Sequence, residues 1–302
     1  MQVIDPHRFG PLWRFNEEFA TLDHAGRPVG YRNLHKLRER IAPVVLRRRK
    51  EEVLSELPER IVSRLSVPMT PRQVALHVDA EGTAAQLVAI LKRRPLTPPE
   101  EQRLMRALQR MRMACDAAGL VDKKTRGAPK LEELERLLEE ICVDEGHKVV
   151  VFTEWERMQV MAAEICERLG VGFVRLHGGV PSDSRGRLID RFREDPDCKV
   201  FLSTDAGGVG LNLQAASHVI NLDLPWNPAV LAQRIARVHR LGQREVVNVV
   251  LLVSEGGFEE RMEGTLDSKR ARSVKYSTSA IRGSATGWVW ISARRPFRST
   301  RA

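Results

Sequence analysis

The alternation of short apolar runs with helix-periodic segments after Lys130 is the feature that most constrains how this chain folds. Five runs of four to seven residues indicate strands: 148–152, 173–176, 199–203, 218–222 and 246–252. The segments between them carry apolar residues at helical spacing, over 131–141, 158–169 and 184–192. Strands that alternate with helices at this pace predict an α/β fold, with a parallel sheet covered by helices on both faces. Functional side chains should then gather at the carboxyl ends of the strands.

The region before Lys130 is predicted to be mainly helical. Residues 71–120 indicate two helices that are started and separated by prolines: Pro71, Pro95, Pro98 and Pro99. Core packing is the expected role of the second helix's apolar side chains: Met105, Leu108, Met111 and Met113. Residues 61–67 alternate partly like a strand, and residues 1–46 mix helix and loop.

The net charge of +10 invites a nucleic-acid partner, but the distribution of the charge weakens that argument. Nine Lys or Arg and no acidic residue lie in 268–302, so the preceding 267 residues carry only about +1. This tail shows no lasting helical or strand period, which predicts disorder. A role in DNA binding must therefore rest on motifs.

Composition also restricts the compartment and the kind of site. No run of eighteen apolar residues occurs, so we expect no membrane contact, and the first ten residues lack the apolar core of a signal peptide. The cysteines lie far apart, with no C-x-x-C pair: Cys115, Cys142, Cys166 and Cys198. This spacing argues against a zinc site and predicts free thiols in a reducing cytoplasm.

The strongest motif is the basic segment 233–243, Q-R-I-A-R-V-H-R-L-G-Q. In a helix, Gln233, Arg237 and Arg240 stand at i, i+4 and i+7, and they would share one face. Two guanidiniums and an amide that converge suit a polyphosphate, because arginine stays charged and donates two hydrogen bonds at once. The alternative is a solvated basic helix face.

Two further segments follow predicted strands. Residues 203–213 hold Gly207, Gly208 and Gly210, whose backbone can approach a ligand closely and donate amides to phosphate. The spacing does not fit the dinucleotide fingerprint, and a turn that serves packing alone is the alternative. Residues 222–228, L-D-L-P-W-N-P, predict a stiff loop, for which a turn with a packed tryptophan is the alternative.

The order of these segments resembles the second RecA-like lobe of SWI/SNF-type ATPases of helicase superfamily 2. Residues 149–155 resemble motif IV, 175–192 the next conserved block, and 203–213 motif V in its A-G-G-x-G-L-N-L form. W-N-P at 226–228 and R-x-H-R-x-G-Q at 237–243 are similarly typical of the family. Upstream, the run L-R-R-R-K-E-E-V with the following L-P is similar to the family's connector between its two lobes. Details of 223–235 lean toward bacterial members, which include RNA-polymerase-associated remodellers.

The resemblance implies a domain organisation. Residues 1–46 would be a remnant of the first lobe or its helical region, and 47–70 the connector between lobes. Residues 71–129 would be a helical insertion, 130–267 the carboxyl-terminal RecA-like lobe, and 268–302 the basic tail.

The resemblance also implies roles for single residues. Arg237 and Arg240 would be arginine fingers on the γ-phosphate of ATP, with Gln233 placing them. The nucleotide would further meet Gly207, Gly208, Gly210 and Asn212. The backbone of double-stranded DNA would touch Thr153, His177, Gly178 and Thr204, although His177 departs from the acidic residue common at its place. Trp155 and Trp226 are expected to be packing residues.

The phosphate-binding motif of a first lobe, G-x-x-x-x-G-K-[ST], has no counterpart, since no Gly-Lys dipeptide occurs in the chain. Residues 144–147, D-E-G-H, follow a helical period and precede a strand, so they indicate a helix-ending turn capped by Gly146 rather than an acidic metal box. We therefore expect ATP and Mg²⁺ to be held mostly by a first lobe, in cis or in trans. This chain alone would be inactive, and a truncated or frameshifted reading frame would explain it.

Three functions remain open at this point. The chain is expected to be the carboxyl-terminal lobe of an ATP-driven double-stranded DNA translocase. The alternative is a non-catalytic module that holds nucleic acid or a polymerase. An ordinary nucleotide-binding α/β enzyme is the third, weakened because no phosphate-cradling motif is complete.

Overall fold

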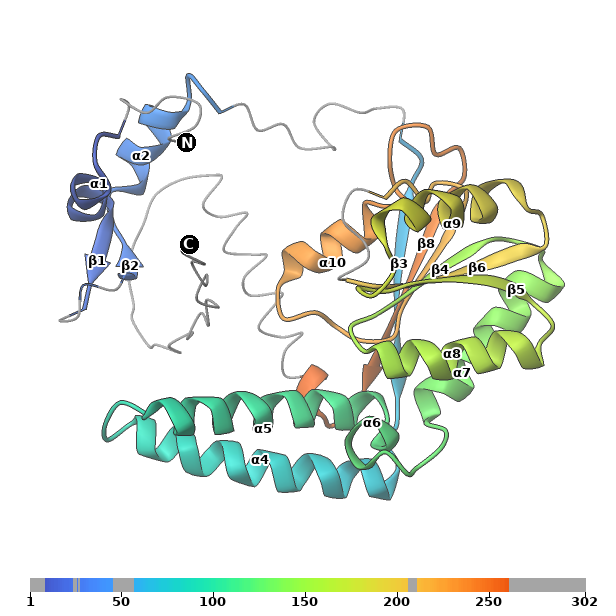
Figure 1. Cartoon of the computed structure of the whole chain (residues 1–302), viewed down its shortest axis with the longest axis horizontal. Helices are drawn as coiled ribbons and strands as arrows, with labels where there is room; N and C mark the ends of the chain where they lie inside the picture. Colours follow the sequence, from blue (N-terminus) through green and yellow to red (C-terminus); the bar gives the residue numbers. More distant parts are fainter. Residues whose placement is uncertain (1–8, 24–25, 27, 46–56, 206–210, 261–302) are drawn as a thin grey trace, which may run out of the picture. The chain divides into compact units, whose positions relative to one another are not determined.

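The computed structural model describes residues 9–23, 26, 28–45, 57–205 and 211–260 (Figure 1). The chain divides into two compact units, Met1–Leu57 and Pro58–Ala302. The glycines at 207, 208 and 210, residues 47–56 of the predicted connector and the basic tail lie outside the described residues.

The first unit is small and holds a hairpin that the sequence did not reveal. Its elements are α1 (Leu12–Phe19), β1 (Ala20–Leu22), β2 (Pro28–Tyr31) and α2 (Leu34–Ile41), with β1 antiparallel to β2. Phe9, Phe15 and Phe19 form its aromatic core, with ring centroids 5.2–6.4 Å apart. Strands of three and four residues are too short to show a reliable period, so only helix and loop were expected.

A parallel sheet is the centre of the second unit, as predicted, and it has six strands. Its order is β3-β8-β7-β4-β6-β5. The strands are β3 (Arg60–Val67), β4 (Val149–Thr153), β5 (Gly172–Leu176), β6 (Cys198–Thr204), β7 (His218–Asn221) and β8 (Val247–Ser254). All five residues of β4 are buried, which explains its continuous apolar sequence.

The boundary predicted for the sheet lobe needs one correction. Strand β3 lies in the stretch expected to be connector, yet it is the edge strand of this sheet (Figure 1). It pairs with β8 over its whole length, from Arg60 opposite Val247 to Val67 opposite Ser254. Most of its side chains are exposed, so it lacks the apolar run that marks the inner strands.

Helices cover both faces of the sheet (Figure 1). On one face lie α7 (Pro129–Leu138), continued by the π-helix η1 (Glu139–Asp144), and α8 (Glu156–Arg168). Their side chains share a core with Val149, Val151 and Leu202. The other face packs against α9 (Ser182–Glu194) and α10 (Pro228–Ile235), where Phe192 and Leu231 meet Phe201.

The segment D-E-G-H forms the helix-ending turn that was predicted. Glu145 follows the last residue of η1, Gly146 has φ +74°, and β4 begins at Val149. The positive φ favours glycine at this position.

The two helices predicted between 71 and 120 are α4 (Pro71–Leu91) and α5 (Pro98–Asp116), followed by the short α6 (Ala118–Asp122). Capping boxes at Thr70 and Thr97 start α4 and α5, with Gln73 and Glu100 as the reciprocal partners. Their shared core is apolar and compact: Ala80, Ala84, Leu87, Leu96, Leu104, Ala107 and Met111.

Among the described helices, α4 alone has the length and composition of a membrane span. Buried Gln73 and His77 interrupt its apolar character. Core helices of soluble proteins pass the same test, so one such helix is weak evidence for a membrane.

Candidate functional site

The carboxyl ends of β5, β6, β4 and β7 lie side by side at one edge of the sheet. Thr153 at the end of β4 pairs with Thr204 at the end of β6, and Leu176 of β5 pairs with Ser203. His177 follows Leu176 directly. Three of the four residues predicted to face DNA therefore stand on neighbouring strand ends, where a parallel sheet exposes its functional side chains.

The two threonines differ in how their hydroxyls are used. Thr153 Oγ1 donates to Asp223 Oδ2 at 2.7 Å and accepts the N–H of Trp155 at 3.2 Å, and the side chain is buried. Thr204 is also buried, but its Oγ1 has no hydrogen-bond partner within the described part of the chain. Of the two hydroxyls, that of Thr153 donates to Asp223, and that of Thr204 has no acceptor among the described residues.

The turn after β5 is more open. His177 Nδ1 accepts the N–H of Gly179 at 3.2 Å and lies 3.4 Å from Glu156 Oε1. Gly178 and Asn212 are exposed. Both are placed where a ligand could reach their polar atoms.

The basic segment corrects one prediction. Helix α10 was expected to continue through Arg240, but it ends at Ile235. At Arg237 and Val238 the backbone N–H groups donate to carbonyls three residues back, those of Arg234 and Ile235, at 3.1 Å each, as in a 3₁₀ turn. The carbonyl of Arg237 accepts the N–H of Leu213 at 3.0 Å, which draws the turn toward a neighbouring segment.

Arg237 and Arg240 nevertheless lie three residues apart in the turn that follows α10. Burial, together with repulsion from the positive charge of Arg240, holds the pKa of Arg237 below its ordinary value. Within residues 57–205 and 211–260, neither side chain has a hydrogen-bond or ion-pair partner. Gln233 lies exposed on α10, just before them. Two unneutralised cations on one turn can bind an anion from outside.

Gln243 is a residue of this turn that the sequence analysis did not single out. It is buried, and its Nε2 donates to the carbonyls of Ala216 and Gln214 at 2.8 and 3.2 Å. Its Oε1 accepts the backbone N–H groups of Arg244 and Glu245. Gln243 thus fixes the end of the turn, and its place as the last residue of R-x-H-R-x-G-Q was the available signal.

Comparison with known proteins identifies the family to which this chain belongs. Residues 129–242 match the family described as the helicase conserved C-terminal domain. The SWI2/SNF2 ATPase core of Sulfolobus solfataricus, solved in complex with dsDNA, has a TM-score of 0.60 and 27% identity over 90% of this chain and 57% of that chain. The C-terminal domain of a Sulfolobus solfataricus SWI2/SNF2 ATPase has a TM-score of 0.57 and 25% identity over 70% of this chain and 87% of that chain.

This chain carries the carboxyl-terminal lobe of a SWI/SNF-type, helicase-related ATPase. It is 31% identical to TATA-binding protein-associated factor mot1 of Aspergillus fumigatus, over 82% of this chain and 15% of that protein. It is 30% identical to the putative ATP-dependent helicase/translocase YwqA of Bacillus subtilis, over 79% of this chain and 26% of that protein. The chain therefore spans about a quarter, or less, of the length of these relatives.

In this SWI/SNF-type lobe, the two tryptophans near the strand ends pack against a buried arginine. Arg112 Cζ of α5 lies 5.5 Å from the ring centroid of Trp155 and 5.2 Å from that of Trp226. Its Nη2 lies 2.6 Å from Glu154 Oε2 and donates to the carbonyl of Leu224 at 3.0 Å. The helical hairpin is thereby joined to the loops that leave β4 and β7.

A second buried cation lies beside the first. Lys130 Nζ donates to Asp116 Oδ1 at 2.8 Å and to Glu259 Oε2 and the carbonyl of Leu222 at 2.7 Å each. Asp116 also accepts the indole N–H of Trp155 at 2.6 Å. Burial raises the pKa of Asp116 well above its ordinary value, against the opposing charge of Lys130. Long side chains buried this completely occur where partners are supplied, and here both carboxylates supply them.

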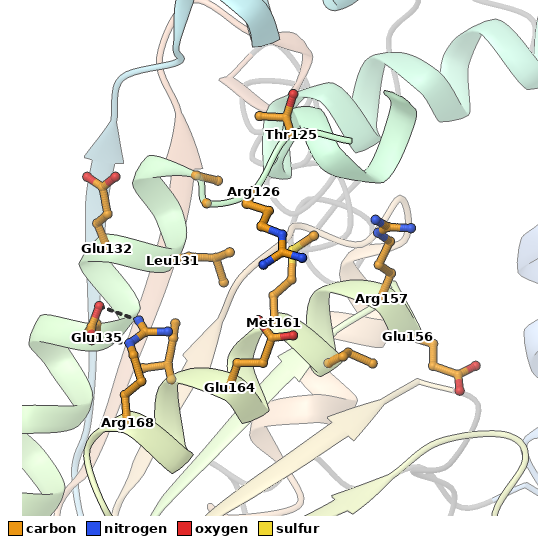
Figure 2. A pocket seen from close by; sticks show the side chains of 14 residues that line it. Thr125, Arg126, Leu131, Glu132, Glu135, Glu156, Arg157, Met161, Glu164 and Arg168 are labelled. Carbon is orange, nitrogen blue, oxygen red and sulfur yellow. Dashed lines mark hydrogen bonds and ion pairs between the residues drawn. The ribbon is translucent and has the colours of Figure 1, made fainter. Parts of the chain in front are cut away.

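A cavity of the SWI/SNF-type lobe lies away from these residues. It has a volume of about 820 Å³ between α7, α8 and the loop 125–128. Figure 2 shows charged side chains around it, with Arg168 paired to Glu135. None of the predicted site residues lines it. The described residues also contain no group of three side chains that could hold a metal ion.

Proposed function

We propose that this chain is the carboxyl-terminal half of an ATP-dependent double-stranded DNA translocase. The observation that carries the proposal is the pair Arg237 and Arg240, which share one turn and have no counter-ion among the described residues. Arginines in this state complete a phosphate site when a nucleotide approaches. The Sulfolobus solfataricus relative, whose core was solved with dsDNA, supports DNA as the polymer.

The residues present would supply part of an ATP site, and Mg²⁺ would be held mostly by a first lobe. Arg237 and Arg240 would donate to γ-phosphate oxygens and stabilise the charge that grows there, with Gln233 beside them. Asn212, Gly207, Gly208 and Gly210 would line the nucleotide. Hydrolysis of bound ATP supplies the energy for opening and closing the cleft between this lobe and a first RecA-like lobe.

Double-stranded DNA would lie along the carboxyl edge of the sheet. Among the described residues the buried hydroxyl of Thr204 has no partner, and His177 and Gly178 lie on a more open turn. Thr153 can join them only if its hydroxyl leaves Asp223. Phosphate contacts of this kind position a duplex without reading its sequence, as a translocase requires.

Reconstitution tests the proposal. The chain is mixed with a separately expressed first lobe of a related SWI/SNF ATPase, and ATP hydrolysis is measured with and without linear duplex DNA. We expect negligible turnover from the chain alone and DNA-stimulated turnover from the pair. Arg237→Ala or Arg240→Ala should lower kcat by about 10³-fold or more, since a finger arginine contributes 10³–10⁵.

The matched control is Arg168→Ala, which removes an exposed arginine at the last residue of α8, before the amino end of β5. It should leave turnover unchanged. Turnover that survives both finger substitutions would contradict the assigned roles.

A non-catalytic module that holds nucleic acid or a polymerase is the second candidate, and the basic tail favours it. Nine Lys or Arg without an acid in 268–302 can bind a polyanion by releasing counter-ions. Salt-dependent duplex binding that persists with a first lobe present but never responds to ATP would support this role. If deleting 268–302 abolishes all affinity, the tail alone carries it.

A further inference from the structure

One buried guanidinium stands apart from the proposed fingers. Arg234 lies one residue before the end of α10 and is almost fully buried, in contrast to Arg237 and Arg240. Its Nε and Nη2 donate to the two oxygens of Asp205, each at 2.7 Å. Nη2 and Nη1 donate further to Oδ1 and the carbonyl of Asp223, each at 3.0 Å.

These contacts fix a geometry rather than merely neutralise a charge. Burial lowers the pKa of Arg234, but Asp223 and Asp205 outweigh that effect, so its pKa lies above the ordinary value. The pair with Asp205 is the two-pronged kind that only a planar guanidinium can make. A buried ion pair adds little stability over well-packed apolar side chains. What apolar side chains could not replace is the fixed orientation that the hydrogen bonds impose on Arg234 and Asp205.

The partners of Arg234 come from different strands. Asp205 follows β6 and Asp223 follows β7, so the guanidinium ties α10 to two strand ends. The carbonyl of Arg234 accepts the N–H of Arg237 at 3.1 Å, so Arg234 anchors the start of the finger turn, residues 237–243. A shift of Arg234 would therefore move Arg237.

Asp223 extends the connection to the proposed DNA edge. While its Oδ1 accepts from Arg234, its Oδ2 accepts from Thr153 Oγ1 at 2.7 Å and from the N–H of Glu154 at 2.6 Å. The end of β4 and Arg234 thus share one buried carboxylate, and Arg234 in turn bonds to Arg237.

We propose that Arg234 is a positioning residue that sets the finger turn, Arg237 to Gln243, against the carboxyl edge of the sheet, and that Asp223 couples this turn to the end of β4. The coupling to DNA rests on the proposed function. The positioning of the turn does not.

Hydrogen exchange of the chain, read by mass spectrometry, tests the positioning part without any ligand. Arg234→Lys keeps the positive charge between the two carboxylates and removes the pair of parallel hydrogen bonds to Asp205. The amides of Arg237 to Gln243 should exchange at least about tenfold faster, because the charge-assisted bonds that hold the turn are lost. The amides of α9 should be unchanged. Arg168→Lys is the matched control, since it alters a similar fork to Glu135 on the exposed face of α8 (Figure 2).

Unchanged exchange in the finger turn would overturn the positioning role. Faster exchange throughout the sheet would also overturn it, because Arg234 would then be only a general structural residue. Should Arg234→Lys not fold, Arg234→Met combined with Asp205→Asn decides instead, since it removes the cation and one carboxylate together. The same local loss of protection is expected.

A second measurement adds a 40-base-pair duplex and tests the coupling. In the unaltered chain, DNA should change exchange both at Thr153 to Trp155 and in the finger turn. In Arg234→Lys, only the change at Thr153 to Trp155 should remain. A change in the finger turn that persists would overturn the coupling. DNA that alters neither segment of the unaltered chain would contradict the coupling and the proposed function, while the ligand-free result would still decide the positioning role.

Discussion

Replacing Lys130 with methionine tests the buried charge cluster through the stability of the lobe. Lys130, Asp116 and Glu259 are each at most 2% exposed, so methionine fills the volume but leaves two carboxylates without their ammonium. Removing one partner of a buried pair costs about 3–5 kcal/mol. At roughly 2–4 °C per kcal/mol for a unit of this size, the melting temperature should fall by about 10 °C.

Urea unfolding followed by circular dichroism measures this loss at two pH values. Without the ammonium, the pKa of Asp116, which burial already raises, should rise further. A carboxyl whose folded pKa exceeds its unfolded value stabilises the fold at acid pH, and this contribution is lost as pH rises through the folded pKa. The deficit of Lys130→Met should therefore be smaller at about pH 5 than at about pH 8.

The control is Arg168→Met, which breaks an exposed pair with Glu135 and should cost less than about 1 kcal/mol. Two results would refute the reasoning. One is a Lys130→Met chain whose stability at pH 8 lies within about 1 kcal/mol of the unaltered chain. The other is a deficit that grows toward acid pH.

Three further substitutions have expected outcomes. Asp116→Asn should flatten the fall in urea midpoint from acid to neutral pH, since burial raises the pKa of Asp116 and its stabilising effect is lost as pH rises; an unchanged slope contradicts this. Gly242→Ala should cost about 1–2 kcal/mol in thermal unfolding, because Gly242 has φ +96° and an added Cβ would stand 3.0 Å from Gln214 Nε2. Thr204→Val should leave stability unchanged or slightly higher, since the Thr204 hydroxyl is buried without a partner in the described chain, yet weaken duplex binding in a fluorescence titration. Unaltered affinity would remove Thr204 from the proposed DNA contacts.

The inner strands could be predicted from the sequence because burial on both faces demands continuous apolar residues. Strand β4 is the clearest example, with every residue buried. Strand β3 shows where that signal stops. It is an edge strand with mostly exposed side chains, so only its pairing with β8 reveals it as part of the sheet.

The end of α10 could not be predicted locally. The residues from Gln233 to Arg240 all suit a helix, and nothing in their order marks Ile235 as the last helical residue. The hydrogen bonds that accompany the end of the helix involve residues distant in the sequence. The N–H of Leu213 donates to the carbonyl of Arg237, and Gln243 Nε2 donates to the carbonyls of Gln214 and Ala216. Tertiary hydrogen bonds of this kind override helix propensity.

The three arginines of the basic segment differ in burial and in ion pairing, and the sequence alone could not distinguish them. A buried guanidinium needs carboxylates, and only the folding of β6 and β7 brings Asp205 and Asp223 to Arg234. Arg237 and Arg240 receive no such partner from the described residues, and burial together with repulsion from Arg240 lowers the pKa of Arg237. A turn that holds two uncompensated cations gains most from an incoming anion, and the neighbouring Arg234, already satisfied, can hold its position while that anion binds and leaves.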